Sequence, residues 1–298
     1  MVVVSVSLIV TSIGSERFGP RVEPPEADTR AIGEAIMIPI GHEPTDLSSH
    51  FRFAGRLARA SGGVLQPLVV ITSTDVAELE DGRATCRATD DVLRRLGGDV
   101  DTALRIDRSV ATGIHRASIE SRSSLLYLPW PDLGGVRSWL LGAGYSEIVA
   151  ASAIPTVVAG IRPDPIERIV VVARRFDLLP GRVPTLNAAL QLAVKAADRD
   201  VETIVGPAGR REIEAAGVEL VEEVRDAGSS DDAATWLSEV TRSGDLVVAP
   251  IDDRINSTLI ALFDAGLSVV AVVHNQASQS VLSGSTLTFP VGGNLGPT

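Results

Sequence analysis

The residues best suited to chemistry form a glycine-rich turn after a predicted strand over residues 124–129. The turn reads Pro-Trp-Pro-Asp-Leu-Gly-Gly over residues 129–135. The candidate ligand-binding residues are Asp132, Gly134 and Gly135 of this turn and Gly142 and Ala143 in the segment that follows it. Where such a turn opens onto a helix N-terminus, its backbone N–H groups can bind phosphate. Adjacent glycines also end ordinary strands, so the turn alone indicates a phosphate site only weakly.

A second candidate site segment, Gly41 and His42, follows a predicted strand over residues 35–40. In an open parallel sheet, ligands bind beyond the carboxyl ends of the strands, where the strand order reverses. The loops after the first and fourth strands flank that place, so Gly41 and the glycine-rich turn are expected to lie together. His42 is either a ligand contact or a loop histidine without a role. Trp130 could plug the site, pack on a partner or stack on a base, and we favour plugging.

Other reactive residue types are scattered along the chain. His50, His115 and His274 lack the spacing of metal ligands. The serines near residue 120 have no Gly-x-Ser-x-Gly context. Arg174 and Arg175 follow another predicted strand and could bind an anion, but we expect a solvated pair. We therefore predict a protein that is not an enzyme and that has no metal site.

Apolar strands and amphipathic helices alternate in two successive units, which would position these residues. In the first unit we predict strands over 35–40, 64–72, 100–107, 124–129 and 155–159, with helices over 46–61, 84–97, 110–122 and 136–151. In the second we predict strands over 168–173, 201–205, 217–224, 245–249 and 268–273, with helices over 184–198, 208–216, 230–242 and 256–265. This alternation predicts an α/β protein with two doubly wound parallel-sheet domains in tandem.

Local signals support several helix ends. The pairs Gly62-Gly63 and Gly97-Gly98 are predicted C-caps. Ser229 or Ser230 is the predicted N-cap of a helix whose first turn holds Asp231 and Asp232. Carboxylates there complement the helix dipole, so we interpret these two aspartates as structural.

Composition excludes some functions. The formal net charge of −11 argues against a nucleic-acid-binding surface, which needs clustered Lys and Arg. We interpret the net negative charge instead as a feature that keeps the protein soluble in a cytoplasm. Cys86 is the single cysteine and cannot form an internal disulfide, which favours a reducing compartment. It lies in a predicted helix and is interpreted as a small packing residue.

The two units differ between their fourth and fifth strands. Pro129 and Pro250, after the fourth strands, are 121 residues apart, whereas Pro155 and Ser268, at the fifth, are 113 apart. The second unit has therefore lost about eight residues there. Its remaining loop, residues 251–256, contains two carboxylates and no glycine. Because carboxylates repel phosphate, the second unit is not expected to bind a nucleotide in this way.

The N-terminus is apolar over residues 1–13, shorter than the roughly 20 residues that span a bilayer. It is either a buried helix or strand, or the end of a transmembrane helix, whose cytoplasmic end often carries arginines such as Arg17 and Arg21. We predict five regions along the chain. They are an apolar segment over 1–19, a linker over 20–33, domains over 34–160 and 166–275, and a flexible tail over 276–298, of which 285–289 could add an edge strand.

Residues 33–275 resemble universal stress protein domains in tandem. The resemblance is carried by Trp139-Leu140-Leu141-Gly142, Ser146-Glu147-Ile148-Val149 and Ala153-Ile154-Pro155-Thr156-Val157-Val158. It implies an adenine nucleotide alpha hydrolase-like fold. ATP-binding members carry Gly-x2-Gly-x9-Gly-Ser/Thr across this turn. Here Pro129 and Asp132 replace the first two glycines, Ala143 replaces the hydroxyl residue, and Gly41-His42 stands where the family has an Asp. The resemblance therefore implies a degraded nucleotide site.

Residues 11–14 (Thr-Ser-Ile-Gly) and 16–19 (Glu-Arg-Phe-Gly) resemble the end of the last membrane helix in monovalent cation/proton antiporters of the Kef-like and Na+/H+ type. This implies a non-catalytic cytosolic regulatory module at the inner face of the cell membrane, with a membrane antiporter domain as partner and a homodimer as a further expectation. The expected ligand is an adenine nucleotide or a cyclic dinucleotide. The alternative is a free-standing tandem stress protein that binds ATP, AMP or a cyclic nucleotide.

Overall fold

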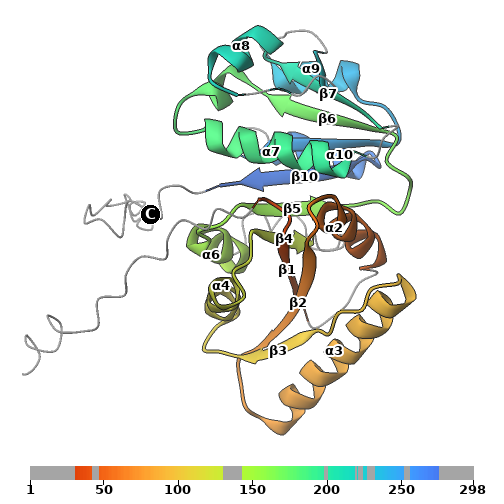
Figure 1. Ribbon diagram of the computed structural model, residues 1–298, viewed down its shortest axis with the longest axis vertical. Coiled ribbons are helices and arrows are strands. Elements are labelled where there is room, and N and C mark those ends of the chain that lie inside the picture. Colours follow the sequence, from red (N-terminus) through yellow and green to blue (C-terminus); the bar gives the residue numbers. More distant parts are fainter. Residues whose placement is uncertain are drawn as a thin grey trace, which may run out of the picture.

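The computed structural model describes residues 31–41, 47–129, 143–197, 201–218, 220, 224–226, 232–251 and 256–274. Ten strands of these residues form one sheet (Figure 1). They are β1 (Ala35–Ile40), β2 (Val64–Ile71), β3 (Ala103–Ile106), β4 (Leu125–Pro129), β5 (Thr156–Gly160), β6 (Arg168–Ala173), β7 (Glu202–Pro207), β8 (Val224–Asp226), β9 (Asp245–Pro250) and β10 (Ser268–Val273). Eight of them begin and end within two residues of the predicted strands, because unbroken apolar runs are typical of strands buried on both faces.

The sheet consists of two parallel sets that meet at one antiparallel pair. Its strand order is β3-β2-β1-β4-β5-β10-β9-β6-β7-β8. We call β1–β5 the first half and β6–β10 the second half. At the junction β5 and β10 run antiparallel, with Val158 opposite Ala271. These two residues are 113 positions apart, as are Pro155 and Ser268 at the starts of the same segments. An approximate twofold axis therefore passes between Val158 and Ala271.

Helices cover both faces of the sheet, which confirms the doubly wound α/β fold. One face carries α2 (Ser48–Ala60), α3 (Val76–Arg95), α7 (Val183–Ala196) and α8 (Arg210–Ala215). The other carries α4 (Val110–Glu120), α6 (Ala143–Ala151), α9 (Ala233–Val240) and α10 (Asn256–Asp264). A short 3-10 helix, η1 (Arg175–Leu178), follows β6.

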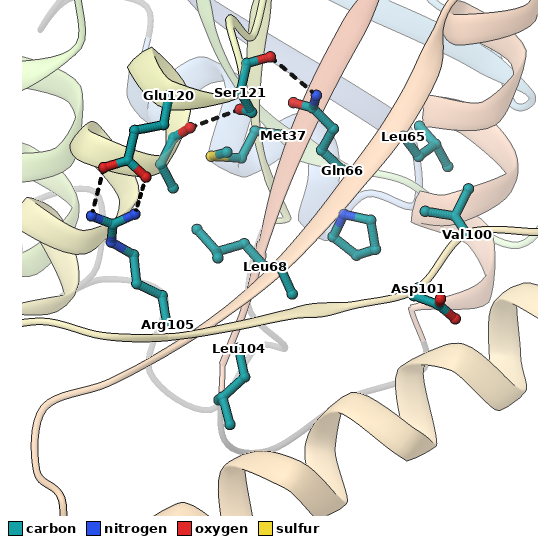
Figure 2. Close-up of a pocket in the computed structure, with 13 residues that line it drawn as sticks. Met37, Leu65, Gln66, Leu68, Val100, Asp101, Leu104, Arg105, Glu120 and Ser121 are labelled. Carbon is teal, nitrogen blue, oxygen red and sulfur yellow. Dashed lines mark hydrogen bonds and ion pairs between the residues drawn. The ribbon is translucent and has the colours of Figure 1, made fainter.

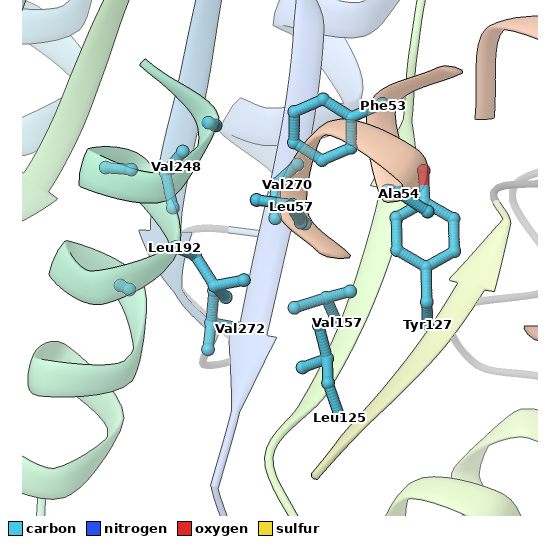
Figure 3. Packing of buried hydrophobic residues seen from close by; sticks show 14 of the residues in the cluster. Phe53, Ala54, Leu57, Leu125, Tyr127, Val157, Leu192, Val248, Val270 and Val272 are labelled. Atoms are coloured by element: carbon cyan, nitrogen blue, oxygen red, sulfur yellow. The ribbon is translucent and has the colours of Figure 1, made fainter. Parts of the chain in front are cut away.

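The hydrophobic core crosses the junction of the two halves. On the α2 and α7 face, Leu57 and Val157 of the first half belong to the same buried cluster as Leu192 and Val272 of the second (Figure 3). Each of these four side chains is at most 2% exposed. The halves thus share one core on this face and are not two separately packed bodies.

Several predicted helix ends need revision. Helix α3 begins at Val76, about two turns before the predicted start at residue 84. A Cβ on Gly82 would lie 2.9 Å from a methyl of Ile71, so this glycine permits close helix–sheet packing and does not mark a helix boundary. Asp232 is the N-cap of α9 itself and accepts from the N–H groups of Ala234 and Thr235. It therefore precedes the first turn, in contrast to the prediction.

Other predictions were confirmed or lie outside the described residues. Gly62 and Gly97 have φ of +62° and +79°, the left-handed conformation of C-cap glycines. Strand β8 is short and begins at Val224, where the predicted strand over 217–224 ends. The apolar segment, nearly all of the linker before residue 31 and the tail after residue 274 are not described. Among the helices that the structure does describe, none is long and apolar enough to cross a membrane.

Candidate functional site

The strand order of the first half reverses between β1 and β4, which are hydrogen-bonded neighbours. Such a reversal of strand order, called a switch point here, is the place where open parallel sheets bind ligands. Gly41 directly follows β1 and is exposed, and a Cβ built on it would meet no atom within 4 Å. Ala143 is the first residue of α6. His42, Asp132, Gly134, Gly135 and Gly142 lie outside the described residues, as does Trp130, so their role in the site stays a prediction.

A buried histidine–tyrosine pair lies beside this switch point. His50 in the first turn of α2 is hydrogen-bonded through Nδ1 to the hydroxyl of Tyr127 at 3.0 Å. Tyr127 is the third residue of β4, and its side chain is wholly buried. Burial raises the pKa of the Tyr127 hydroxyl well above its ordinary value, so it stays neutral and can act as a hydrogen-bond donor.

Sequence reasoning left His50 without a role. A signal was present, because His50, Phe53, Ala54 and Leu57 have the i, i+3, i+4, i+7 spacing of one helix face, and all four are buried. Their neighbours across the sheet could not be found from spacing. Tyr127 is 77 positions away in the chain from His50.

The second half has an arginine–carboxylate pair at the equivalent place, between β6 and β9. Arg174, the residue after β6, donates from Nε to Asp177 Oδ2 and from Nη2 to Asp177 Oδ1, both at 2.8 Å. The Asp177 carboxylate also accepts from the Arg174 backbone N–H at 3.0 Å. Nη2 of Arg174 lies 3.4 Å from the carbonyl oxygen of Pro250, the last residue of β9. The pair therefore bridges the ends of the two strands.

This pair is largely inside the protein. The side chain of Asp177 is 0% exposed and that of Arg174 is 13% exposed. The expectation of a solvated arginine pair was therefore wrong for Arg174, whereas Arg175 is 68% exposed and forms an ion pair with Glu212 at 3.3 Å. Arg182 Nη1 also donates to the carbonyl oxygen of Ile251 at 3.3 Å, beside the end of β9. The second switch point is thus filled by the protein's own side chains.

A separate surface cavity of about 380 Å³ lies at the opposite end of the first half (Figure 2). Its floor includes Met37 and Leu68, and its rim includes a two-pronged ion pair from Arg105 to Glu120, with N–O distances of 2.6 and 3.0 Å. Gln66 donates to the carbonyl oxygen of Ser121 at 3.3 Å. These polar rim groups bond to one another. The cavity is also lined by the N-terminal part of β2, whereas ligands bind beyond the carboxyl ends of the strands. We therefore do not consider it the ligand site.

The structure describes two further histidines. His115 is within α4, and His274 follows β10, where burial lowers the pKa of its imidazole. In the part of the chain that the structure describes, no three His, Cys, Asp or Glu residues are grouped as a metal site would require. Cys86 is buried in α3.

Comparison with known proteins identifies the fold. No family model matches the chain, and no curated protein matches it in sequence. A solved structure of a putative universal stress protein from Pseudomonas aeruginosa UCBPP-PA14 is 15% identical, with a TM-score of 0.54 over 81% of this chain and 93% of that chain. The chain has a universal stress protein-like fold.

Two further structures share this fold. A functionally unknown protein from Pseudomonas aeruginosa PAO1 is 15% identical, with a TM-score of 0.54 over 81% of this chain and 92% of that one. The cytoplasmic domain of a prokaryotic cation chloride cotransporter is 14% identical, with a TM-score of 0.52 over 80% of this chain and 95% of that one. The universal stress protein-like fold therefore also occurs as the cytoplasmic part of a transporter.

Proposed function

We propose that this chain is a non-catalytic, ligand-sensing regulatory module on the cytosolic side of a cation/proton antiporter-like protein. The observation that carries the proposal is the difference between the two switch points. In the second half, Arg174 and Asp177 fill the place where the fold binds ligands. In the first half, Gly41 is exposed with open space around it, and the glycine-rich turn follows the neighbouring strand. The first half is thus suited to bind a ligand, and the second half is suited to a structural role.

Among the described residues near the two switch points, His50 pairs with Tyr127 and Arg174 pairs with Asp177, which supports a binding role over a catalytic one. A general base must be within hydrogen-bond reach of the proton that it abstracts from a substrate. A carboxylate whose two oxygens both accept from a largely buried arginine is not placed to do that.

The proposed ligand is an adenine nucleotide or a cyclic dinucleotide. A turn with adjacent Gly134 and Gly135, followed by a helix, offers backbone N–H groups to a phosphate. The substitutions at Pro129, Asp132 and Ala143 remove two glycines and a hydroxyl relative to ATP-binding stress proteins. We therefore expect ATP to bind weakly, and cyclic dinucleotides are the second class of ligand to be tested.

The proposed attachment to an antiporter is supported by two separate likenesses. Residues 11–19 resemble the end of an antiporter membrane helix. The fold is shared with the cytoplasmic domain of a cation chloride cotransporter. Reading the DNA upstream of the codon for Met1 tests the attachment. Membrane-helix codons in frame would support it, whereas an intergenic gap with its own ribosome site would contradict it and favour a free-standing stress protein.

Titration calorimetry with ATP, AMP and cyclic dinucleotides tests ligand sensing. A Gly41→Leu side chain would enter the open space at the first switch point, so we expect it to weaken ligand binding at least about tenfold, equivalent to about 1.4 kcal/mol. The matched control is Gly181→Leu in the second half, because Gly181 is also exposed with no atom within 4 Å of a Cβ.

Loss of binding in Gly41→Leu with binding retained in Gly181→Leu would support the proposed site. If none of these nucleotides gave a heat of injection into the wild-type protein larger than its heat of dilution, ligand sensing of this class would be excluded. Micromolar affinity for ATP would show that the glycine-rich turn is not degraded and would favour the free-standing stress protein.

A further inference from the structure

Helices α2 and α7, one from each half, pack against each other on the same face of the sheet (Figure 1). At this contact the last turn of α7 carries Lys195, which is the only lysine in the chain. The ammonium of Lys195 donates to the carbonyl oxygen of Ile32 and, at 3.0 Å, to the hydroxyl of Ser61. A residue of the second half thus contacts the chain just before β1, which begins at Ala35.

Residues 31–34 form a tight turn, here called the 31–34 turn. The backbone N–H of Glu34 donates to the carbonyl oxygen of Ala31 at 3.1 Å, and Gly33 has φ of +98°, which favours glycine. The hydroxyl of Ser61, directly after α2, donates to Ile32 at 3.1 Å. Val64 of β2 donates to Glu34 at 3.0 Å. The turn is therefore held by α2 and β2 on one side and by Lys195 on the other.

The Lys195 ammonium is partly desolvated, and this burial lowers its pKa, while the nearby Glu34 carboxylate acts in the opposite direction. A partly buried cation is costly unless its hydrogen bonds are made. If the two halves rotated apart, Lys195 would lose the Ile32 carbonyl and the Ser61 hydroxyl together. The geometry thus makes the 31–34 turn sensitive to the angle between the halves.

A second bond joins the same two helices but does not touch the turn. Arg56 of α2 donates from Nη1 to the carbonyl oxygen of Ala196 at the end of α7, at 3.3 Å. Lys195 and Arg56 therefore have different consequences. Both connect the halves, whereas Lys195 alone of the two also connects the second half to the chain that precedes β1.

We propose that Lys195 is a positioning residue through which the second half fixes the 31–34 turn, so that a change in the angle between the halves is passed to the chain before residue 31. The proposal rests on the proposed regulatory function for its purpose, because a sensing module must pass a movement to the segment that precedes it. It also gives the second half, whose switch point is filled, a mechanical role.

Amide hydrogen exchange in the full chain, followed by NMR, tests this inference. In Lys195→Met we expect exchange at the Glu34 and Val64 amides to accelerate about tenfold or more, as expected for the loss of a charged hydrogen bond. The β5 and β10 amides should keep their rates. Arg56→Met, the matched control, should leave Glu34 and Val64 unchanged, and Lys195→Arg should restore part of their protection because it keeps a cationic donor.

A distance measurement tests the relay itself. Spin labels at Ala31→Cys and Arg211→Cys, in a Cys86→Ser background, report the turn against the second half, and both sites are exposed. Lys195→Met should broaden this distance distribution, whereas a label pair at Ala31→Cys and Ala88→Cys, within the first half, should not broaden.

Two results would overturn the inference. One is unchanged exchange at Glu34 and Val64 in Lys195→Met; the other is equal acceleration at these amides and in β5 and β10, which would indicate general destabilisation. The proposed function fails separately. If Lys195→Met gave the expected exchange rates but calorimetry showed no nucleotide binding, ligand sensing would be refuted and the role of the Lys195 contact would be retained.

Discussion

Asp177 has no exposed side-chain surface, yet both of its carboxylate oxygens accept hydrogen bonds from the one guanidinium of Arg174. A buried carboxylate without a partner is costly, and a bidentate arginine is the partner that best matches its geometry. The pair is therefore a fixed part of the second half. In the first half the comparable pair consists of His50 in α2 and Tyr127 in β4. The tyrosine of this pair is uncharged.

Removing one partner of the Arg174–Asp177 pair should be strongly destabilising. We expect Asp177→Ala to lower the free energy of unfolding by about 3–5 kcal/mol, because the Arg174 cation remains partly buried without its anion. The double variant Arg174→Met/Asp177→Leu should lose less than Asp177→Ala alone, because it leaves no buried charge. Urea denaturation of the three proteins measures this. A loss below about 1 kcal/mol for Asp177→Ala would indicate a solvated pair.

At the scale of elements, β3 and α4 are connected at the edge of the first half by Asp107. Its carboxylate accepts from the Arg108 N–H at 2.8 Å and forms ion pairs with Arg105 of β3 and Arg116 of α4 at 3.4 and 3.3 Å. The Arg108 N–H bond, with help from Arg116 and Arg105 and against the effect of burial, holds the pKa of Asp107 below its ordinary value. The same arginine, Arg105, lowers the pKa of Glu120.

These shifts predict the acid dependence of stability. A carboxyl group whose folded pKa is depressed stabilises the fold above its unfolded pKa of about 3.8, and this stabilisation disappears as the pH falls through the folded value. Asp107→Asn should therefore melt below the wild type at pH 7, and the difference should shrink as the pH falls below about 4. Melting curves by circular dichroism between pH 7 and 2.5 measure it. A difference that stays constant over that range would contradict the assignment.

The elements also show how far sequence reasoning extends. Runs such as Ile169–Val172 are apolar at every position and gave strand bounds close to those observed, because burial on both faces leaves no polar residue to blur the pattern. Helix α3 begins at Val76, eight residues before the predicted start at residue 84, and the part that was missed contains Gly82, a residue with low helix propensity. The pairings of His50 with Tyr127 and of Lys195 with Ile32 span 77 and 163 positions, and no local pattern encodes them. The glycine-rich turn lies outside the described residues and stays a prediction.

At the scale of the whole molecule, the two halves are joined by a ten-stranded sheet and a shared core. The segment between β5 and β6 reinforces the junction, because Arg162 places its guanidinium 3.9 Å from the ring centroid of Phe263 in α10. Gly160 allows this close approach, since a Cβ there would lie 2.7 Å from the same ring. Neither half can be removed without exposing the core residues that cross β5 and β10.

The shared core predicts one cooperative unfolding transition. Scanning calorimetry of the full chain should give a single peak whose calorimetric and van't Hoff enthalpies agree. Residues 31–160 expressed alone should expose the β5 edge and either aggregate or pair with a second copy through β5, which light scattering would detect. Two well-separated peaks, together with a soluble monomeric fragment, would show that the halves fold independently.

The approximate twofold axis between Val158 and Ala271 has a consequence for how such a protein can change over time. In an assembly of two identical chains, any substitution appears on both sides of the axis at once. Here residues 161–167 join the two sides into one polypeptide, so a substitution alters one side only. One side is therefore free to acquire Arg174 and Asp177 while the other keeps its glycines, and a division of labour can evolve without a second gene.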